Sequence, residues 1–110
     1  MIDYDALAEL EELMEDDFPE LTHTYIDDCE LRIENLEKYL QLNDADAVRE
    51  HAHSLKGSSA NLFVTALAEA GKNMEDEARQ GNLTNGIEHL ENIKHIFSTV
   101  KNIFQSKGWI

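Results

Sequence analysis

The chain contains one proline and five glycines among 110 residues, and runs of β-branched residues are missing. Proline and glycine interrupt helices, and β-branched runs favour strands, so their scarcity leaves the helix as the main element. A hydrophobic content of 42% is enough for one core and excludes a disordered chain. At this length we expect a single domain spanning residues 1–110. The composition therefore predicts an all-α protein.

Positive charge and long apolar runs are also scarce. Nine Lys and Arg stand against 23 Asp and Glu, a formal net charge of −14. Such a polyanion repels nucleic acid and anionic membranes, because phosphate binding requires clustered Lys and Arg. The sequence has no run of about 18 apolar residues and no secretion signal. Its single cysteine, Cys29, agrees with a reducing compartment. We therefore expect a cytoplasmic protein that binds neither membranes nor nucleic acid.

Hydrophobic periodicity predicts five helices. They cover about residues 3–15, 18–42, 45–62, 65–80 and 84–106. Within them, Leu13 of the first helix and Ile87 of the last are assigned to inward-facing stripes. Short connections between long helices favour antiparallel neighbours. We expect an antiparallel up-down four-helix bundle, with the short additional N-terminal helix as a lid.

The most informative segment is Ala52–Leu62, AHSLKGSSANL, within the third predicted helix. His53, Lys56 and Gly57 share one face of that helix, because residues three and four apart are surface neighbours. Relative to Leu55 on the inward stripe, His53 is rotated by about 200°, so its ring faces solvent. A glycine within a helix costs about 1 kcal/mol relative to alanine. Its place beside an exposed histidine indicates that a bulky partner must approach the ring.

This segment resembles the phospho-acceptor motif of histidine-containing phosphotransfer (HPt) domains, the modules of bacterial and fungal phosphorelays. The resemblance covers about Phe18–Phe104 and fits the helix order of the family. It implies that His53 accepts the phosphoryl group, that Lys56 supplies positive charge and that Gly57 leaves room for the partner. Glu75 falls where the family often has a polar side chain that orients the acceptor ring. A surface glutamate is the alternative interpretation of Glu75.

The resemblance also implies the partners. These are the receiver domain of a response regulator, whose aspartate gives or takes the phosphoryl group, and a sensor or hybrid histidine kinase. The expected contacts around His53 are Arg49, Ala60, Phe63 and Val64. Many members have glycine where this chain has Phe63, so either the turn after the acceptor helix differs or Phe63 is an apolar contact. Because the chain starts at Met1 with almost no leader, we expect a free-standing protein and not a piece of a hybrid kinase. We also expect it to be of the bacterial type and monomeric.

The sequence offers no nucleotide or metal site. It has no glycine-rich phosphate loop and no carboxylate cluster at a recognisable metal-binding spacing. His51 and His53 lie about 200° apart around a helix and cannot chelate one ion. We expect a phosphoryl carrier without kinase activity of its own and without a cofactor. Mg²⁺ for the transfer is expected in the partner receiver domain.

Other functions remain open beside the carrier. His53 on its own is also compatible with an ordinary histidine on a solvated helix face. The chain as a whole is compatible with a helical adaptor that binds a signalling partner through an apolar groove and carries no phosphate, and, as a distant third, with a metal-dependent enzyme. The acidic segment 9–17 is interpreted as a solvated face, with a docking role as the alternative. The presence of an acceptor histidine favours the phosphorelay, because HPt-like adaptors commonly lack it.

Overall fold

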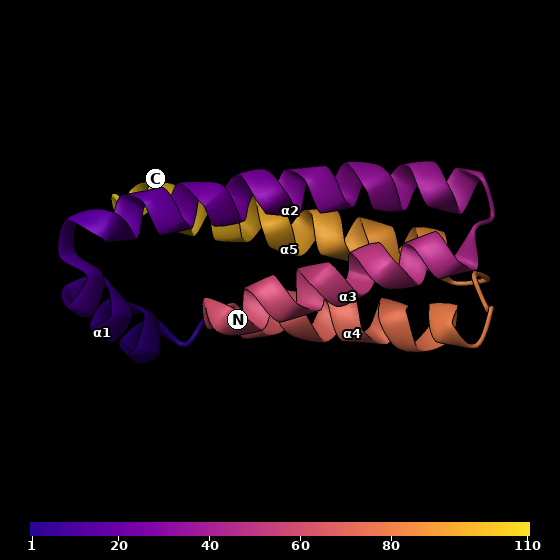
Figure 1. The fold of residues 1–110 in the computed structure, drawn as a ribbon, viewed down its shortest axis with the longest axis horizontal. Helices are drawn as coiled ribbons and strands as arrows, with labels where there is room; N and C mark the ends of the chain where they lie inside the picture. Colours follow the sequence, from indigo (N-terminus) through magenta and orange to yellow (C-terminus); the bar gives the residue numbers. More distant parts are fainter.

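Four long helices run side by side along the 42 Å axis of the molecule (Figure 1). The computed structural model describes residues 1–110. Its elements are α1 (Tyr4–Met14), the 3-10 turn η1 (Glu15–Asp17), α2 (Phe18–Gln41), α3 (Ala45–Asn61), α4 (Thr65–Arg79) and α5 (Gly86–Ser106). The predicted all-α fold is confirmed, and each helix begins and ends within two residues of its expected bounds. No helix combines the length and hydrophobicity needed to span a bilayer.

Local capping sets several of these bounds. The carboxylates of Asp3 and Asp44 accept hydrogen bonds from the backbone N–H three residues later, at 3.1 Å in both cases, and so begin α1 and α3. Gly81 follows α4 with a φ of 73°, the left-handed conformation that ends a helix and that glycine adopts without cost. Residues 82–85 lie outside the helices, so α5 begins two residues later than expected.

The helices α2, α3, α4 and α5 surround one core, and each contacts the next while α5 returns to α2. Consecutive helices are antiparallel (Figure 1). The largest side chains of the core include Leu36, Leu55, Leu67, Met74, Ile93 and Phe104. The arrangement confirms the expected up-down four-helix bundle.

The short helix α1 crosses one end of the bundle (Figure 1). The N-terminal residues before it pair with the turn between α3 and α4. The N–H of Asp3 donates to the carbonyl of Phe63 at 2.9 Å, and the N–H of Ala66 donates to the carbonyl of Met1 at 3.0 Å. Ile2, between the two, is buried. This segment therefore fixes the turn that follows the helix carrying His53.

Two side chains assigned to inward stripes face solvent. Leu13 is 75% exposed, because α1 meets the bundle only along a narrow stripe centred on Leu7. Ile87 is 74% exposed, because Gly86 contacts Leu40 of α2 and turns its neighbour outward. Both predictions were wrong for the same reason. A helical pattern places a residue on an apolar stripe, but it does not show how much of that stripe is covered by another helix.

Candidate functional site

His53 lies midway along α3, and its side chain is 62% exposed. The core-facing residues of the same helix are fully buried, including Ala52 just before it and Leu55 two positions after it. The rotation around the helix thus directs the imidazole outward, as the spacing predicts. Gly57 and Ala60 continue this exposed face toward the end of α3.

Glu75 of α4 is buried directly beneath this face, at 1% exposure. One carboxylate oxygen, Oε2, forms a hydrogen bond with Nδ1 of His53. The other, Oε1, accepts a hydrogen bond from Nζ of Lys56 at 2.6 Å. The guanidinium of Arg79, one turn further along α4, lies 3.5 Å from Oε2. The structure therefore joins His53, Lys56 and Glu75 in one site and excludes the surface-glutamate interpretation.

The surroundings of Glu75 fix its charge. Burial acts to raise the pKa of the carboxyl, while the hydrogen bonds from Lys56 and His53 lower it, and the pKa ends below its ordinary value. The group is therefore an ionised carboxylate at neutral pH, which can only accept hydrogen bonds. Nδ1 of His53 must then be the donor, so in the neutral ring the proton resides on Nδ1 and the lone pair on Nε2. Nε2 has no partner within the protein.

No large side chain of Gly57 or Ala60 stands in the way of a partner that approaches Nε2. A Cβ added to Gly57 would have no atom within 4 Å, so the glycine leaves open space beside the ring. Ala60 is exposed and contributes only a methyl group, whereas Arg49 is half-buried one turn before His53. Three of the four residues expected to contact a partner, Arg49, Ala60 and Phe63, thus keep accessible surface.

Val64 does not. Its side chain is fully buried, and its N–H donates to the carbonyl of Ser59 at 2.9 Å. Val64, the residue just before α4, therefore belongs to the core, and its assignment to the partner surface was wrong. The preceding Phe63 is half-buried and has a φ of 60°, the left-handed conformation that favours glycine. The turn thus has a glycine-type conformation in spite of the phenylalanine.

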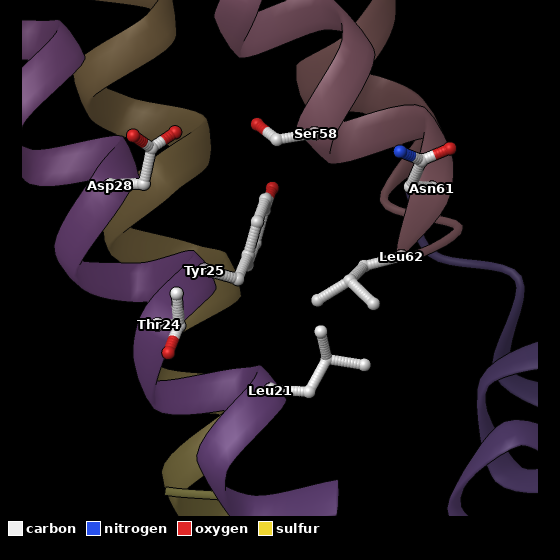
Figure 2. A pocket seen from close by; sticks show the side chains of 7 residues that line it. All are labelled: Leu21, Thr24, Tyr25, Asp28, Ser58, Asn61 and Leu62. Atoms are coloured by element: carbon white, nitrogen blue, oxygen red, sulfur yellow. The ribbon is translucent and has the colours of Figure 1, made fainter.

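A groove of about 220 Å³ lies between α2 and the second half of α3. Figure 2 shows its lining, with Leu21 and Leu62 facing each other beside the Tyr25 ring. Thr24, Asp28, Ser58 and Asn61 complete the lining. The hydroxyl of Tyr25 is hydrogen-bonded to the hydroxyl of Ser59 at 2.7 Å, which holds the ring in place. The groove is the apolar depression on the α2 side of the helix that carries His53.

Two residues of the site had not been assigned from the sequence. Arg79 stands four positions after Glu75, a helical spacing that places both on one face of α4 and was available as a signal. Gly71 packs against the backbone of α3, and no spacing within α4 reveals such a contact. No group of three or more His, Cys, Asp or Glu side chains is placed to hold a metal ion.

Comparison with known proteins shows the family and the fold. A family model described as the Hpt domain matches residues 20–103. The chain belongs to the Hpt domain family. It is also similar to the crystal structure of histidine-containing phosphotransfer protein B (HptB) from Pseudomonas aeruginosa PAO1, with a TM-score of 0.93 and 38% sequence identity. The similarity covers 96% of this chain and 92% of that chain. No curated protein sequence matches.

Membership of the family sets the general function. Hpt domains are phosphocarriers and not kinases, and they interact with kinases and receiver domains in phosphorelays. The chain is therefore a histidine phosphotransfer protein, as its resemblance predicted.

Proposed function

We propose that His53 is the phosphorylated residue and that Nε2 is the atom that bonds to phosphorus. The observation that carries this proposal is the hydrogen bond between Nδ1 and the buried carboxylate of Glu75. It assigns the proton to the inner nitrogen and leaves the lone pair on the outer one. An imidazole in this state is a nucleophile ready for attack.

The transfer is a substitution at phosphorus. The Nε2 lone pair attacks the phosphoryl group of a receiver aspartyl phosphate, an N–P bond forms, and the P–O bond breaks with its electron pair left on the aspartate carboxylate. The imidazole gains positive charge as the bond forms, because Nδ1 keeps its proton. The Glu75 carboxylate lies next to that charge and stabilises it, in the way that a buried aspartate stabilises the histidine of a serine protease. The reverse sequence of bonds returns the phosphoryl group to a receiver.

Lys56 and Arg79 supply the positive charge for the phosphoryl oxygens in this proposal. Both cations already meet at Glu75, on the α4 side of the His53 ring. The Lys56 side chain is 31% exposed, and its ammonium is carried on a flexible stem. The ammonium can therefore move from Glu75 toward an oxygen of a phosphoryl group bonded to Nε2. Arg49 adds a third cation on the same face of α3.

The partner surface is proposed to centre on His53 and to include Arg49, Ala60 and Phe63. Gly57 lets the partner come close, and the groove beside Leu21 and Leu62, between α2 and the helix that carries His53, offers an apolar depression for a side chain of a receiver domain. The Mg²⁺ ion of the reaction is expected to come with the receiver. A helical adaptor without phosphate would use the groove but has no need of a carboxylate buried beneath an exposed histidine.

The proposal is tested by labelling. The protein is incubated with a panel of receiver domains carrying ³²P on their aspartates, and a His53→Gln variant is compared with His95→Gln, which alters an exposed histidine of α5. We expect label on the wild type and on His95→Gln, lost in mild acid and kept in base as for a phosphoramidate, and none on His53→Gln. Label on a folded His53→Gln protein contradicts the proposal, with folding checked by circular dichroism.

A further inference from the structure

Helix α4 packs directly on the backbone of α3 at Gly71. A Cβ built on this residue would lie 3.1 Å from the carbonyl oxygen of Ala52 and 3.1 Å from the amide nitrogen of Lys56. Ordinary van der Waals contacts of a Cβ measure 3.4–4 Å. Both neighbours are backbone atoms of a helix and cannot rotate aside as the end of a side chain would. The absence of a side chain at Gly71 therefore sets how closely α4 packs on α3.

This contact lies at the level of the candidate site. Ala52 and Lys56 bracket His53 in α3, one residue before it and three residues after it. Gly71 and Glu75 are four residues apart on α4 and share one face, so the close approach lies one turn from the carboxylate that reaches the ring. Glu75 spans from α4 to both His53 and Lys56 with a single side chain. That span holds only while the two helices remain at this separation.

Gly57 and Gly71 thus serve different purposes. The space beside Gly57 is open, whereas the space at Gly71 is filled by the backbone of α3. Alanine fits at the first position without displacing any atom, but at the second position it forces the helices apart by a few tenths of an ångström.

We propose that Gly71 is a positioning residue for phosphoryl transfer: it brings α4 close enough for Glu75 to hold the His53 ring. This inference rests on the proposed function of His53 and Glu75. Gly71 itself touches neither the ring nor a substrate. Its effect reaches the reaction through the length of the hydrogen bond between Glu75 and Nδ1, which selects the tautomer with a free Nε2.

The test compares Gly71→Ala with Asn73→Ala. Asn73 is exposed on the same helix and makes no side-chain hydrogen bond, so its replacement changes helix propensity without changing the contact with α3. The ¹⁵N chemical shifts of the His53 ring report which nitrogen carries the proton, and they are a readout that a merely structural role would not move. We expect Gly71→Ala to reduce the share of the Nδ1–H tautomer and to slow labelling from a phosphorylated receiver about tenfold. Asn73→Ala is expected to change neither.

A double-mutant cycle with Glu75→Ala isolates the pathway of the effect. If Gly71 acts through Glu75, the Gly71→Ala change slows labelling in the wild type but has no further effect once the carboxylate is gone. Equal slowing in both backgrounds overturns the proposal, as do unchanged ring shifts in Gly71→Ala. Loss of the folded state in Gly71→Ala also overturns it, because Gly71 would then be required by the bundle as a whole.

Failure of this inference is distinguishable from failure of the proposed function. Label that stays on His53→Gln refutes the acceptor assignment whatever Gly71 does. Normal labelling of His53 in both the wild type and Gly71→Ala refutes only the positioning role.

Discussion

At the scale of single residues, the site depends on one carboxylate with three hydrogen-bonding or charged neighbours, of which Lys56 and Arg79 are cations. An isolated buried charge is costly, and it persists only when its oxygens are paired with donors. In Glu75, Oε1 is paired with Lys56 and Oε2 is shared between His53 and Arg79. Because Arg79 stays beside Oε2 when the Lys56 ammonium turns toward the phosphoryl group, the carboxylate keeps a cationic partner during the proposed transfer.

Gly57 is expected to separate partner access from folding. Gly57→Ala fills open space and raises helix propensity, so it should stabilise the protein by up to about 1 kcal/mol. Gly57→Gln gains similar propensity but extends over the surface beside Nε2, and it should slow transfer from a receiver about tenfold or more. Urea denaturation gives the first quantity and ³²P labelling gives the second. A Gly57→Gln protein that transfers at the normal rate would show that the partner does not approach over this residue.

The spacing within α3 was sufficient to predict one half of the site. His53, Lys56 and Gly57 lie on one helix, and a rotation of about 100° per residue places them on one exposed face. The other half comes from α4, and its contribution depends on the distance between two helices. The resemblance to the family pointed to Glu75, but its burial, the pairing with Arg79 and the close contact at Gly71 are properties of packing that one-dimensional spacing does not contain.

At the scale of elements, the turn between α3 and α4 combines a backbone strain with a stabilising contact. A bulky residue in the left-handed conformation of Phe63 costs about 1–2 kcal/mol. Backbone hydrogen bonds hold the turn in place. The N–H of Phe63 donates to the carbonyl of Ala60, and the carbonyl of Phe63 accepts from the N–H of Asp3. The N-terminal segment therefore stabilises a turn that the sequence of the turn itself disfavours.

The strain predicts an unusual order of stabilities. Phe63→Ala loses the packing of the aromatic ring and keeps the strained backbone, whereas Phe63→Gly loses the same packing but relieves the strain. We expect Phe63→Gly to be more stable than Phe63→Ala by about 1 kcal/mol, although glycine is ordinarily the more destabilising of the two. The midpoints of urea unfolding compare the variants directly. The opposite order would mean that the turn does not keep its positive φ in solution.

The periodicity predicted every helix, but it was less successful where an element lies at the margin of the bundle. Leu13 and Ile87 were assigned to the inward stripes of their helices, but both are exposed. Val64 lies in the tight turn just before α4, where the direction of a side chain is set by the chain reversal and not by a helical period. In each case the outcome depends on which surface lies opposite, and that is decided by the tertiary arrangement.

At the scale of the whole molecule, pH acts on the contact between α2 and α3. Nδ1 of His51 lies 3.1 Å from the guanidinium of Arg32, and the His51 ring stacks on the ring of Tyr39. Burial and the Arg32 charge lower the pKa of His51, whereas Glu50 and Asp28 act in the opposite direction and are outweighed. The folded state therefore binds a proton at His51 less readily than the unfolded state does.

The sign of the resulting pH dependence follows from linkage. Since the folded pKa lies below the unfolded value of about 6.5, the contribution of His51 to stability is present above that pH and is lost as the pH falls below it. We expect the wild type to lose free energy of unfolding relative to His51→Gln between about pH 8 and about pH 5.5. Relief of repulsion in the acidic chain affects both proteins alike and cancels in the difference. A difference that does not change with pH would show that His51 titrates normally.

In the proposed function, the outward-facing Nε2 of His53 also governs the timing of a relay. The atom that takes the phosphoryl group from a donor would be the atom that gives it to an acceptor, because the second ring nitrogen is hydrogen-bonded to Glu75. Donor and acceptor cannot therefore be attached to the ring at once. Each turnover consists of two half-reactions separated by departure of the first partner, which is a ping-pong sequence. Tight binding of either the donor or the acceptor therefore slows the overall transfer. The throughput of such a carrier is then set by how fast partners exchange, and by how long the N–P bond survives in water while the ring stands uncovered.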